Sequence, residues 1–173
     1  MIISKANKDN GLHIFRLSIN KNIPVIFPTD TIYGIGAPLS STVANKKIYE
    51  IKKRPINMPF PILVGNITQL SDIADITNLT DEANEYIHNW RPATTLILKA
   101  KNNINGIYNK DNTIAVRIPK LDWLRETLIE LGEPVTATSV NINKSPFAKN
   151  IQEALNIFVN RFYTIFLIYF IDK

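Results

Sequence analysis

The sequence predicts a single α/β domain of 173 residues built on one open sheet of mixed parallel and antiparallel strands, with flanking helices. Short apolar runs, typical of buried strands, alternate with segments whose apolar residues recur at helical spacing. An Asn-rich stretch at residues 101–112 joins two strand-like runs as a hairpin, which breaks the strict strand–helix–strand order of a parallel sheet. No repeat, low-complexity tract or Pro/Gly/Ser-rich linker divides the chain, so we expect one domain over residues 1–173.

In the first half of the chain, two helices and two strands are expected. The apolar positions Leu12, Phe15 and Ile19 share one helical face over residues 7–20, and a buried strand follows at Ile23–Phe27. A second helix is expected from about Ser41 to Lys53, with Ser40 or Ser41 as its cap. Its inner side is expected to carry Val43, Lys47, Ile48 and Ile51. Pro61–Val64 follows as a short strand.

The second half continues the alternation. A helix begins at Thr80, because Asp81 and Glu82 follow the cap, and it carries Ala83, Tyr86, Ile87 and Trp90 inward. The remaining expected elements are strands at Thr94–Lys99, Thr113–Ile118 and Pro134–Thr138, and helices at Leu121–Leu131 and Ile151–Asn160. The apolar run Phe162–Ile171 is shorter than the roughly 20 residues that span a membrane, so a buried strand is expected there.

Composition limits the chemistry. The chain has no cysteine and two histidines, which excludes disulfides, a thiolate zinc site and a cysteine nucleophile, and fits a cytoplasmic protein. The first residues lack the apolar core of a signal peptide. A formal net charge of +5 favours polyanions as partners.

The segment Pro28–Ala37, PTDTIYGIGA, follows the first strand and contains hydroxyls, a carboxylate and two glycines. Polar groups there lie at the carboxyl end of a strand, where open α/β sheets bind ligands. The segment matches neither a Walker loop nor a complete dinucleotide fingerprint. Taken alone, the pattern favours a glycine turn with a helix cap.

Three consecutive cations, residues 52–54, stand where the second helix ends before Pro55. Lys52 and Arg54 could converge on one anion, since arginine supplies a planar fork and lysine a mobile point charge. A solvated basic turn beside the helix dipole is the better interpretation of this segment alone.

Arg117 ends an otherwise apolar strand and is followed closely by Pro119. An arginine in such a place is costly to bury without an anion, so it is a candidate for binding a carboxylate or a phosphate. A salt bridge to a structural Asp or Glu is an equal alternative.

Ser139 and Asn141 follow another strand, two residues apart. They could offer a hydroxyl and an amide to a nucleotide, a phosphate or a metal-bound water. Alone, they would indicate a turn held by side-chain-to-backbone hydrogen bonds.

Together, in this order and spacing, the four segments resemble the YrdC-like family, the L-threonylcarbamoyladenylate synthases. PTDTIYGIG matches the family's PT[DE]TxYGLG, and the triplet Lys52–Arg54 with Pro55 matches K-x-R-P. Val116–Pro119 matches VRxP, and Thr138–Asn141 matches [PT]SxN. The resemblance runs from about Pro24 to Glu153.

The resemblance implies a YrdC/RibB-like fold around a basic concave cleft. It also implies a nucleotidyltransferase that joins L-threonine, bicarbonate and ATP into threonylcarbamoyl-AMP and releases pyrophosphate. The product would supply the tRNA threonylcarbamoyl-transferase machinery, which modifies an adenosine beside the anticodon. Such a reaction depends on positioning and charge neutralisation and needs no protein nucleophile, so the absence of cysteine does not prevent it.

The resemblance assigns roles by position. Thr31, Arg117 and Ala137 would bind threonine, with Arg117 on its carboxylate. The residues expected to contact ATP are Lys52, Arg54, Met58, Thr113 and Ser139. The catalytic set would be Lys52, Arg54, Ser139 and Asn141. Mg²⁺ would arrive through ATP phosphates and waters, so we assign no protein residue as a metal ligand.

The sequence also departs from the family pattern. Met58 replaces a polar or basic residue, Phe147 stands where serine is frequent, and the apolar Phe162–Ile171 run replaces a segment expected near the nucleotide. These departures leave an alternative open, a weakened or inactive YrdC-like protein that binds tRNA or double-stranded RNA in the same cleft. A carbamoyl-phosphate-using relative, as in hydrogenase-maturation proteins, is disfavoured because its acylphosphatase and zinc-finger domains are absent.

Overall fold

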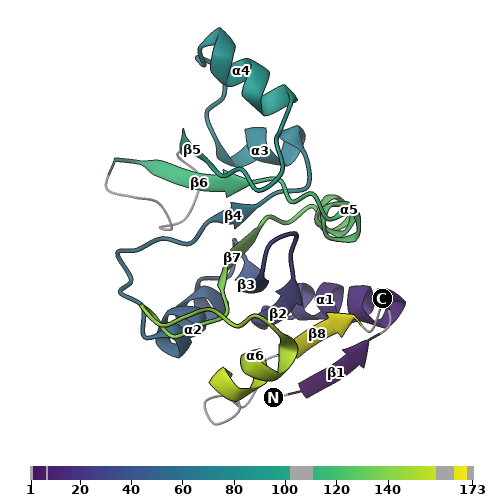
Figure 1. The fold of residues 1–173 in the computed structure, drawn as a ribbon. Helices are drawn as coiled ribbons and strands as arrows, with labels where there is room; N and C mark the ends of the chain where they lie inside the picture. Colours follow the sequence, from purple (N-terminus) through teal and green to yellow (C-terminus); the bar gives the residue numbers. More distant parts are fainter. Residues whose placement is uncertain (1, 7, 102–110, 159–165, 171–173) are drawn as a thin grey trace.

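Eight strands form one sheet in the order β1-β8-β2-β3-β7-β4-β6-β5 in a computed structural model that describes residues 2–6, 8–101, 111–158 and 166–170 (Figure 1). The strands are β1 (Ile2–Ala6), β2 (Val25–Pro28), β3 (Tyr33–Pro38), β4 (Ile62–Leu63), β5 (Leu96–Lys99), β6 (Thr113–Arg117), β7 (Val135–Ser139) and β8 (Phe166–Phe170). The helices are α1 (Lys8–Asn20), α2 (Thr42–Lys52), α3 (Ile67–Ile73), α4 (Asp81–His88), α5 (Asp122–Leu131) and α6 (Ile151–Phe158).

The strand directions confirm the mixed sheet. β8 pairs parallel with β1 and β2, and β4 pairs parallel with β6, whereas the pairs β2–β3, β3–β7, β4–β7 and β5–β6 are antiparallel. The apolar tail is confirmed as a strand over Phe166–Phe170, and it lies inside the sheet between β1 and β2. The rest of that run lies outside the described residues, as do residues 102–110 of the predicted hairpin loop.

Helices cover both faces of the sheet, and β2 shows how the sequence divides between them. Val25 and Phe27 pack with residues of α1 and α5 on one face, whereas Ile26 packs with α2 and α6 on the other. The Phe15 ring of α1 lies edge-on to two other rings, with ring centres 5.1 Å apart for Phe27 and 5.9 Å apart for Trp123 of α5. Alternate strand residues thus supply two separate cores.

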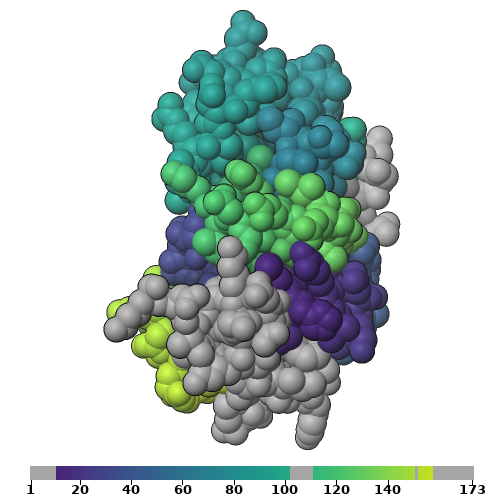
Figure 2. Space-filling view, turned by 90° about the vertical axis from the view of Figure 1, so that its right-hand side faces the viewer, coloured from purple at the N-terminus to yellow at the C-terminus, as the bar shows by residue number. Residues whose placement is uncertain are grey.

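A third cluster lies at the far end of the sheet, where α3 and α4 pack with β4, β5 and β6. Figure 2 shows α5, in green, between this teal end and α1, in purple. None of the described helices is both long and apolar enough to cross a membrane.

The predicted glycine turn over Gly34 and Gly36 is wrong, because these residues belong to strand β3. The turn is confined to residues 29–32, before the glycines. A Cβ at Gly36 would lie 2.1 Å from the Thr136 carbonyl oxygen of the neighbouring strand β7. Gly36 therefore serves close packing inside the sheet.

The inner face predicted for α2 is partly wrong. Ile48 and Ile51 are buried and Ser41 caps the helix as predicted, but Val43 and Lys47 are exposed. Asn45 takes an inward position, where its amide donates to the Pro38 carbonyl (2.8 Å) and accepts from the Thr136 hydroxyl (2.5 Å). A buried polar residue hid the true helix face from a pattern based on hydrophobicity.

Three further differences concern the ends of the sheet. Trp90 lies beyond the end of α4, and its indole N–H donates to the Thr94 carbonyl (3.3 Å). Strand β1 and helix α3 were not predicted. Helix α3 has 7 residues, with Asn66 as its cap, which is too short for a clear helical period.

Candidate functional site

A cavity of about 320 Å³ opens where the turn after β2 meets the ends of β6 and β7 and the segment after α2. Its lining residues are Thr29, Asp30, Thr31, Ile32, Tyr33, Gly34, Arg54, Pro61, Leu63, Thr95, Arg117, Pro119, Ala137, Thr138 and Ser139. Five of the predicted site residues therefore share one cavity: Thr31, Arg54, Arg117, Ala137 and Ser139. The strands β2 and β7 run in the same direction on either side of β3, which brings their polar ends to one edge.

The turn between β2 and β3 is organised by Thr29. Its hydroxyl donates to the Ile32 carbonyl (2.7 Å) and accepts from the backbone N–H of Thr31 (3.2 Å). The hydroxyls of Thr29 and Thr31 lie 3.2 Å apart. This network holds Thr31 at the mouth of the cavity, where it is exposed.

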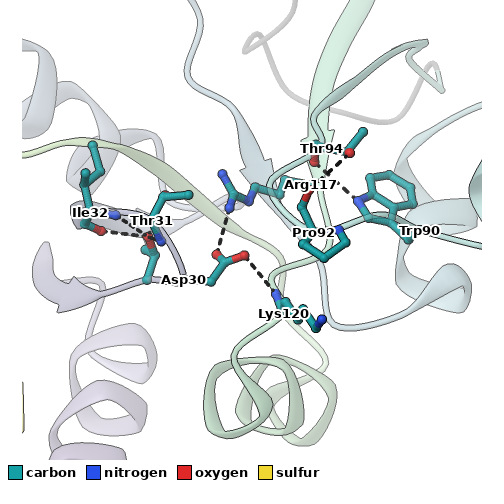
Figure 3. Close-up of polar contacts among 9 residues, drawn as sticks. Asp30, Thr31, Ile32, Trp90, Pro92, Thr94, Arg117 and Lys120 are labelled. Atoms are coloured by element: carbon teal, nitrogen blue, oxygen red, sulfur yellow. Dashed lines mark hydrogen bonds and ion pairs between the residues drawn. The ribbon is translucent and has the colours of Figure 1, made fainter.

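Arg117 forms a salt bridge with Asp30, with 2.8 Å between Nη2 and Oδ1 (Figure 3). The second carboxylate oxygen of Asp30 accepts from the backbone N–H of Lys120 (3.2 Å). The structure therefore realises the alternative of a structural acid, yet Arg117 also lines the cavity and keeps further N–H groups. Burial opposes the charge on Asp30, but the hydrogen bonds from Arg117 and Lys120 outweigh it and lower the Asp30 pKa from 3.8.

Arg54 is held against the cavity wall by the loop that follows it. Its Nε donates to the Met58 carbonyl (2.9 Å) and its Nη2 to the Pro59 carbonyl (3.2 Å). The guanidinium carbon lies 5.3 Å from the centre of the Phe60 ring, which stacks on Tyr49 at 4.1 Å. The guanidinium is thus fixed in place before any ligand arrives.

Lys52 is fully buried and does not line the cavity. Its ammonium donates to the carbonyls of Ser139 (2.5 Å) and Asn141 (2.9 Å) and to Asn141 Oδ1 (2.5 Å). Burial, followed by the nearby charge of Arg54, lowers the Lys52 pKa to about 8. Lys52 and Arg54 therefore do not lie together on the cavity wall.

Asn141 links Lys52 to Ser139. Its Oδ1 also accepts from the Ser139 hydroxyl (2.9 Å), and its Nδ2 donates to the Ser145 carbonyl (2.7 Å). Ser139 and Ala137 lie on β7, and both line the cavity. Of the predicted catalytic set, Arg54 and Ser139 line the cavity. Lys52 and Asn141 do not line it, and both contact Ser139.

The other two predicted ATP contacts lie away from the cavity lining. The Met58 side chain is 44% exposed, and the residue acts in the site through its carbonyl, which accepts from Arg54 and from the Tyr49 hydroxyl (3.1 Å). Thr113 begins β6 and pairs with Lys99, four residues before Arg117.

Sequence reasoning did not assign Asp30, Thr29 or Thr95 to the site. Asp30 stood inside a segment already marked as polar, but its partner Arg117 is 87 residues away in the sequence. The sequence did indicate a salt bridge from Arg117 to an Asp or Glu as an equal alternative, but it did not identify the acidic residue.

No cluster of three or more His, Asp or Glu side chains that could hold a metal ion occurs in the part of the chain that the structure describes. Among the lining residues Asp30 is the acidic one, and both of its oxygens are already bonded. These residues do not form a carboxylate cage for Mg²⁺.

The fold and the site define an α/β protein with a cleft lined by two guanidinium groups, each held by protein partners, and by several hydroxyl side chains. The profile of the Sua5/YciO/YrdC family, described as telomere recombination, matches residues 18–168. The chain therefore belongs to the Sua5/YciO/YrdC family.

Relatives and solved structures agree with this. The chain is 33% identical over 132 residues to threonylcarbamoyl-AMP synthase of Wigglesworthia glossinidia brevipalpis, covering 75% of this chain and 68% of that protein. It is 34% identical to the same enzyme of Bacillus subtilis, covering 74% of this chain and 37% of that one. P. abyssi Sua5 complexed with L-threonine superposes with a TM-score of 0.80 at 27% identity, covering 96% of this chain and 48% of that chain. The chain thus spans about half the length of P. abyssi Sua5.

Proposed function

We propose that this chain is a threonylcarbamoyl-AMP synthase, which makes threonylcarbamoyl-AMP and pyrophosphate from L-threonine, bicarbonate and ATP. The observation that carries the proposal is the cavity that gathers Thr31, Arg54, Arg117, Ala137 and Ser139. Relatives named threonylcarbamoyl-AMP synthase and a family member complexed with L-threonine support it.

In this proposal Arg117 binds the threonine carboxylate. The salt bridge to Asp30 is made through Nη2 of the guanidinium and holds the side chain at the cavity, so the remaining N–H groups can take a second carboxylate from the cavity side. Thr31, held by Thr29, lies on the same wall. The fixed position reduces the entropy lost when threonine binds.

Two bond-forming steps follow. The threonine amine attacks the carbon of bicarbonate, and loss of water leaves a carbamate. A carbamate oxygen then attacks the α-phosphorus of ATP, the bond to the β-phosphate oxygen breaks, and pyrophosphate leaves with the electron pair. Arg54 and Arg117 lower the repulsion between the two anions because both guanidinium groups line the cavity in fixed positions.

Mg²⁺, carried by the ATP phosphates and by water, would neutralise phosphate charge during the second step. The one acidic lining residue, Asp30, is committed to Arg117 and Lys120, which supports a metal ion that arrives with the nucleotide. The proposal includes a cytoplasmic location, where ATP and tRNA are found, and delivery of the product to the tRNA threonylcarbamoyl-transferase machinery.

Isotope exchange between pyrophosphate and ATP tests the proposal. Exchange should depend on both threonine and bicarbonate, because the nucleotide reacts only after the carbamate has formed. Folded protein that gives no exchange, or exchange that needs neither substrate, would contradict the proposal.

A further inference from the structure

The three N–H donors of the Lys52 ammonium all point at one short segment. They contact the Ser139 carbonyl, the Asn141 carbonyl and Asn141 Oδ1 at 2.5–2.9 Å. The Lys52 carbonyl also accepts from the backbone N–H of Asn143 (2.9 Å). An ammonium has three donors and no acceptor, so these contacts use all of its hydrogen-bonding capacity.

These contacts determine the orientation of the Asn141 amide. The atom facing Lys52 must be an acceptor, because an ammonium cannot accept a hydrogen bond. That atom is the amide oxygen, and the nitrogen on the other side donates to the Ser145 carbonyl (2.7 Å). The reversed amide would set two donors against each other at Lys52.

The orientation of the amide determines the direction of the hydrogen bond at Ser139. An amide oxygen only accepts, so the hydrogen bond of 2.9 Å between Asn141 Oδ1 and Ser139 Oγ is donated by the serine. A serine hydroxyl has a single proton, and here it points away from the cavity. What Ser139 offers to the cavity is a pair of oxygen lone pairs.

We propose that Lys52 and Asn141 are positioning residues that hold the Ser139 hydroxyl as a hydrogen-bond acceptor, so that Ser139 binds an O–H or N–H group of a substrate and no phosphate oxygen. The proposal rests on the proposed function for its substrates, and it changes the role of Lys52, whose charge orients a hydroxyl. All three substrates carry suitable donors: the nucleoside of ATP, the threonine and the O–H group of bicarbonate.

Calorimetric titration of Ser139→Ala with ATP, inorganic tripolyphosphate, L-threonine and bicarbonate tests the donor rule. Loss of one uncharged hydrogen bond should weaken the donor-bearing substrate by about 5–10-fold, in line with about 1 kcal/mol for such a bond. The affinity for tripolyphosphate, which offers only oxygen acceptors, should stay within about twofold. Ser145→Ala is the matched control, because Ser145 is exposed in the same loop and contacts Asn141 through its carbonyl alone.

The source of the donor follows from analogues tested on the unaltered chain and on Ser139→Ala. If the nucleoside supplies it, 2′-deoxy-ATP or 3′-deoxy-ATP binds both proteins equally. If the threonine hydroxyl supplies the donor, 2-aminobutyrate, which lacks that hydroxyl, binds both proteins equally. If neither substitution removes the difference, the adenine or threonine N–H groups remain as donors, and the donor rule still holds.

Lys52→Met separates positioning from folding. Without the Lys52 ammonium the Asn141 amide can reverse, and the Ser139 hydroxyl can then turn its proton to the cavity, so the donor-bearing substrate should weaken more than tripolyphosphate does. Asn141→Asp keeps an acceptor for Lys52 and for Ser139. It should therefore retain more of the preference for the donor-bearing substrate over tripolyphosphate than Asn141→Leu does. If Lys52→Met does not fold, the pair of Asn141 variants decides the same point.

Two results separate this inference from the proposed function. If Ser139→Ala binds ATP, L-threonine and bicarbonate as tightly as the unaltered chain does, the donor rule is overturned and the synthase is left standing. The donor rule is also overturned if Ser139→Ala loses as much affinity for tripolyphosphate as for the substrate that it binds more weakly. An unaltered chain that binds neither ATP nor threonine overturns both.

Discussion

At the scale of single residues, the site consists of charged groups fixed by partners that are themselves fixed. Arg117 is held by Asp30, Arg54 by the carbonyls of residues 58 and 59, and Lys52 by the turn at residues 139–141. The energetic benefit of such an arrangement is that reorganisation is completed on folding and not during the reaction.

Arg117→Ala should weaken threonine binding by about 10–100-fold, the range for loss of a hydrogen bond to a charged group. It also leaves the Asp30 carboxylate without its cation, which adds repulsion against the substrate carboxylate. Threonine titration measures the effect. Arg125→Ala is the control, because that exposed arginine lies 3.9 Å from Asp122 outside the cavity. Equal affinity in both variants would remove Arg117 from threonine binding.

Lys52 gives the site a pH dependence. Its pKa of about 8 means that the ammonium loses a proton as the pH rises through that value, and the neutral amine has two donors for three acceptors. The affinity for the donor-bearing substrate should therefore fall above pH 8. After burial, the positive charge of Arg54 is the second cause of the lowered Lys52 pKa.

Stability should move in the opposite direction. Because the folded pKa of about 8 lies below the ordinary 10.5, the unfolded chain holds more protons between these values. This group alone therefore makes the free energy of unfolding rise with pH across that window. Calorimetry and chemical denaturation at matched pH values check both signs, and Lys52→Met should show neither dependence.

At the scale of elements, strand β3 is the structural centre of the site. It separates β2, which leads into the threonine-rich turn, from β7, which carries Ala137 and Ser139. Gly34 lies directly opposite Ser139, and Gly36 opposite Ala137. The spacing between these strands sets the width of the cavity wall.

Gly36→Ala should destabilise the protein by about 3 kcal/mol, the upper end of the usual range for overpacking. The new Cβ would meet the Thr136 carbonyl oxygen at 2.1 Å, and backbone cannot move aside as a side chain can. Gly34→Ala is the matched change, because its Cβ would meet a Thr29 methyl group at 3.3 Å. Chemical denaturation should rank Gly36→Ala clearly below Gly34→Ala, and equal midpoints would contradict the packing explanation.

At the scale of the whole molecule, the net charge of +5 exceeds what the cavity uses. Arg54 and Arg117 account for two positive charges facing the cavity, and Asp30 offsets one. The remaining cations are distributed over the rest of the chain, and they carry the prediction that the protein binds RNA.

Binding of tRNA, if it uses this charge, should weaken steadily as salt rises. The logarithm of the affinity should fall linearly with the logarithm of the salt concentration, with a slope of about −0.7 to −0.9 for each phosphate neutralised. Filter binding or fluorescence anisotropy at several salt concentrations measures the slope. Saturating ATP should compete only if RNA occupies the same cavity. No binding at low salt would contradict the prediction.

The sequence alone was sufficient for the elements whose patterns are local. Apolar periodicity located most of the strands and helices, and the four polar segments marked every stretch of chain that supplies a predicted site residue to the cavity. It failed where a buried polar group broke the pattern, as at Asn45, or where a strand contained two glycines, as at Gly34 and Gly36.

What the sequence by itself determined was the residue types and their order, because motif chemistry and periodicity are properties of neighbouring residues. Only the tertiary structure decided the partners. The Asp30–Arg117 salt bridge and the Lys52–Asn141–Ser139 network join residues 87 and 89 positions apart, and strand pairing, not local propensity, brings them together. The tertiary structure also placed Lys52 away from the cavity and Arg54 beside it.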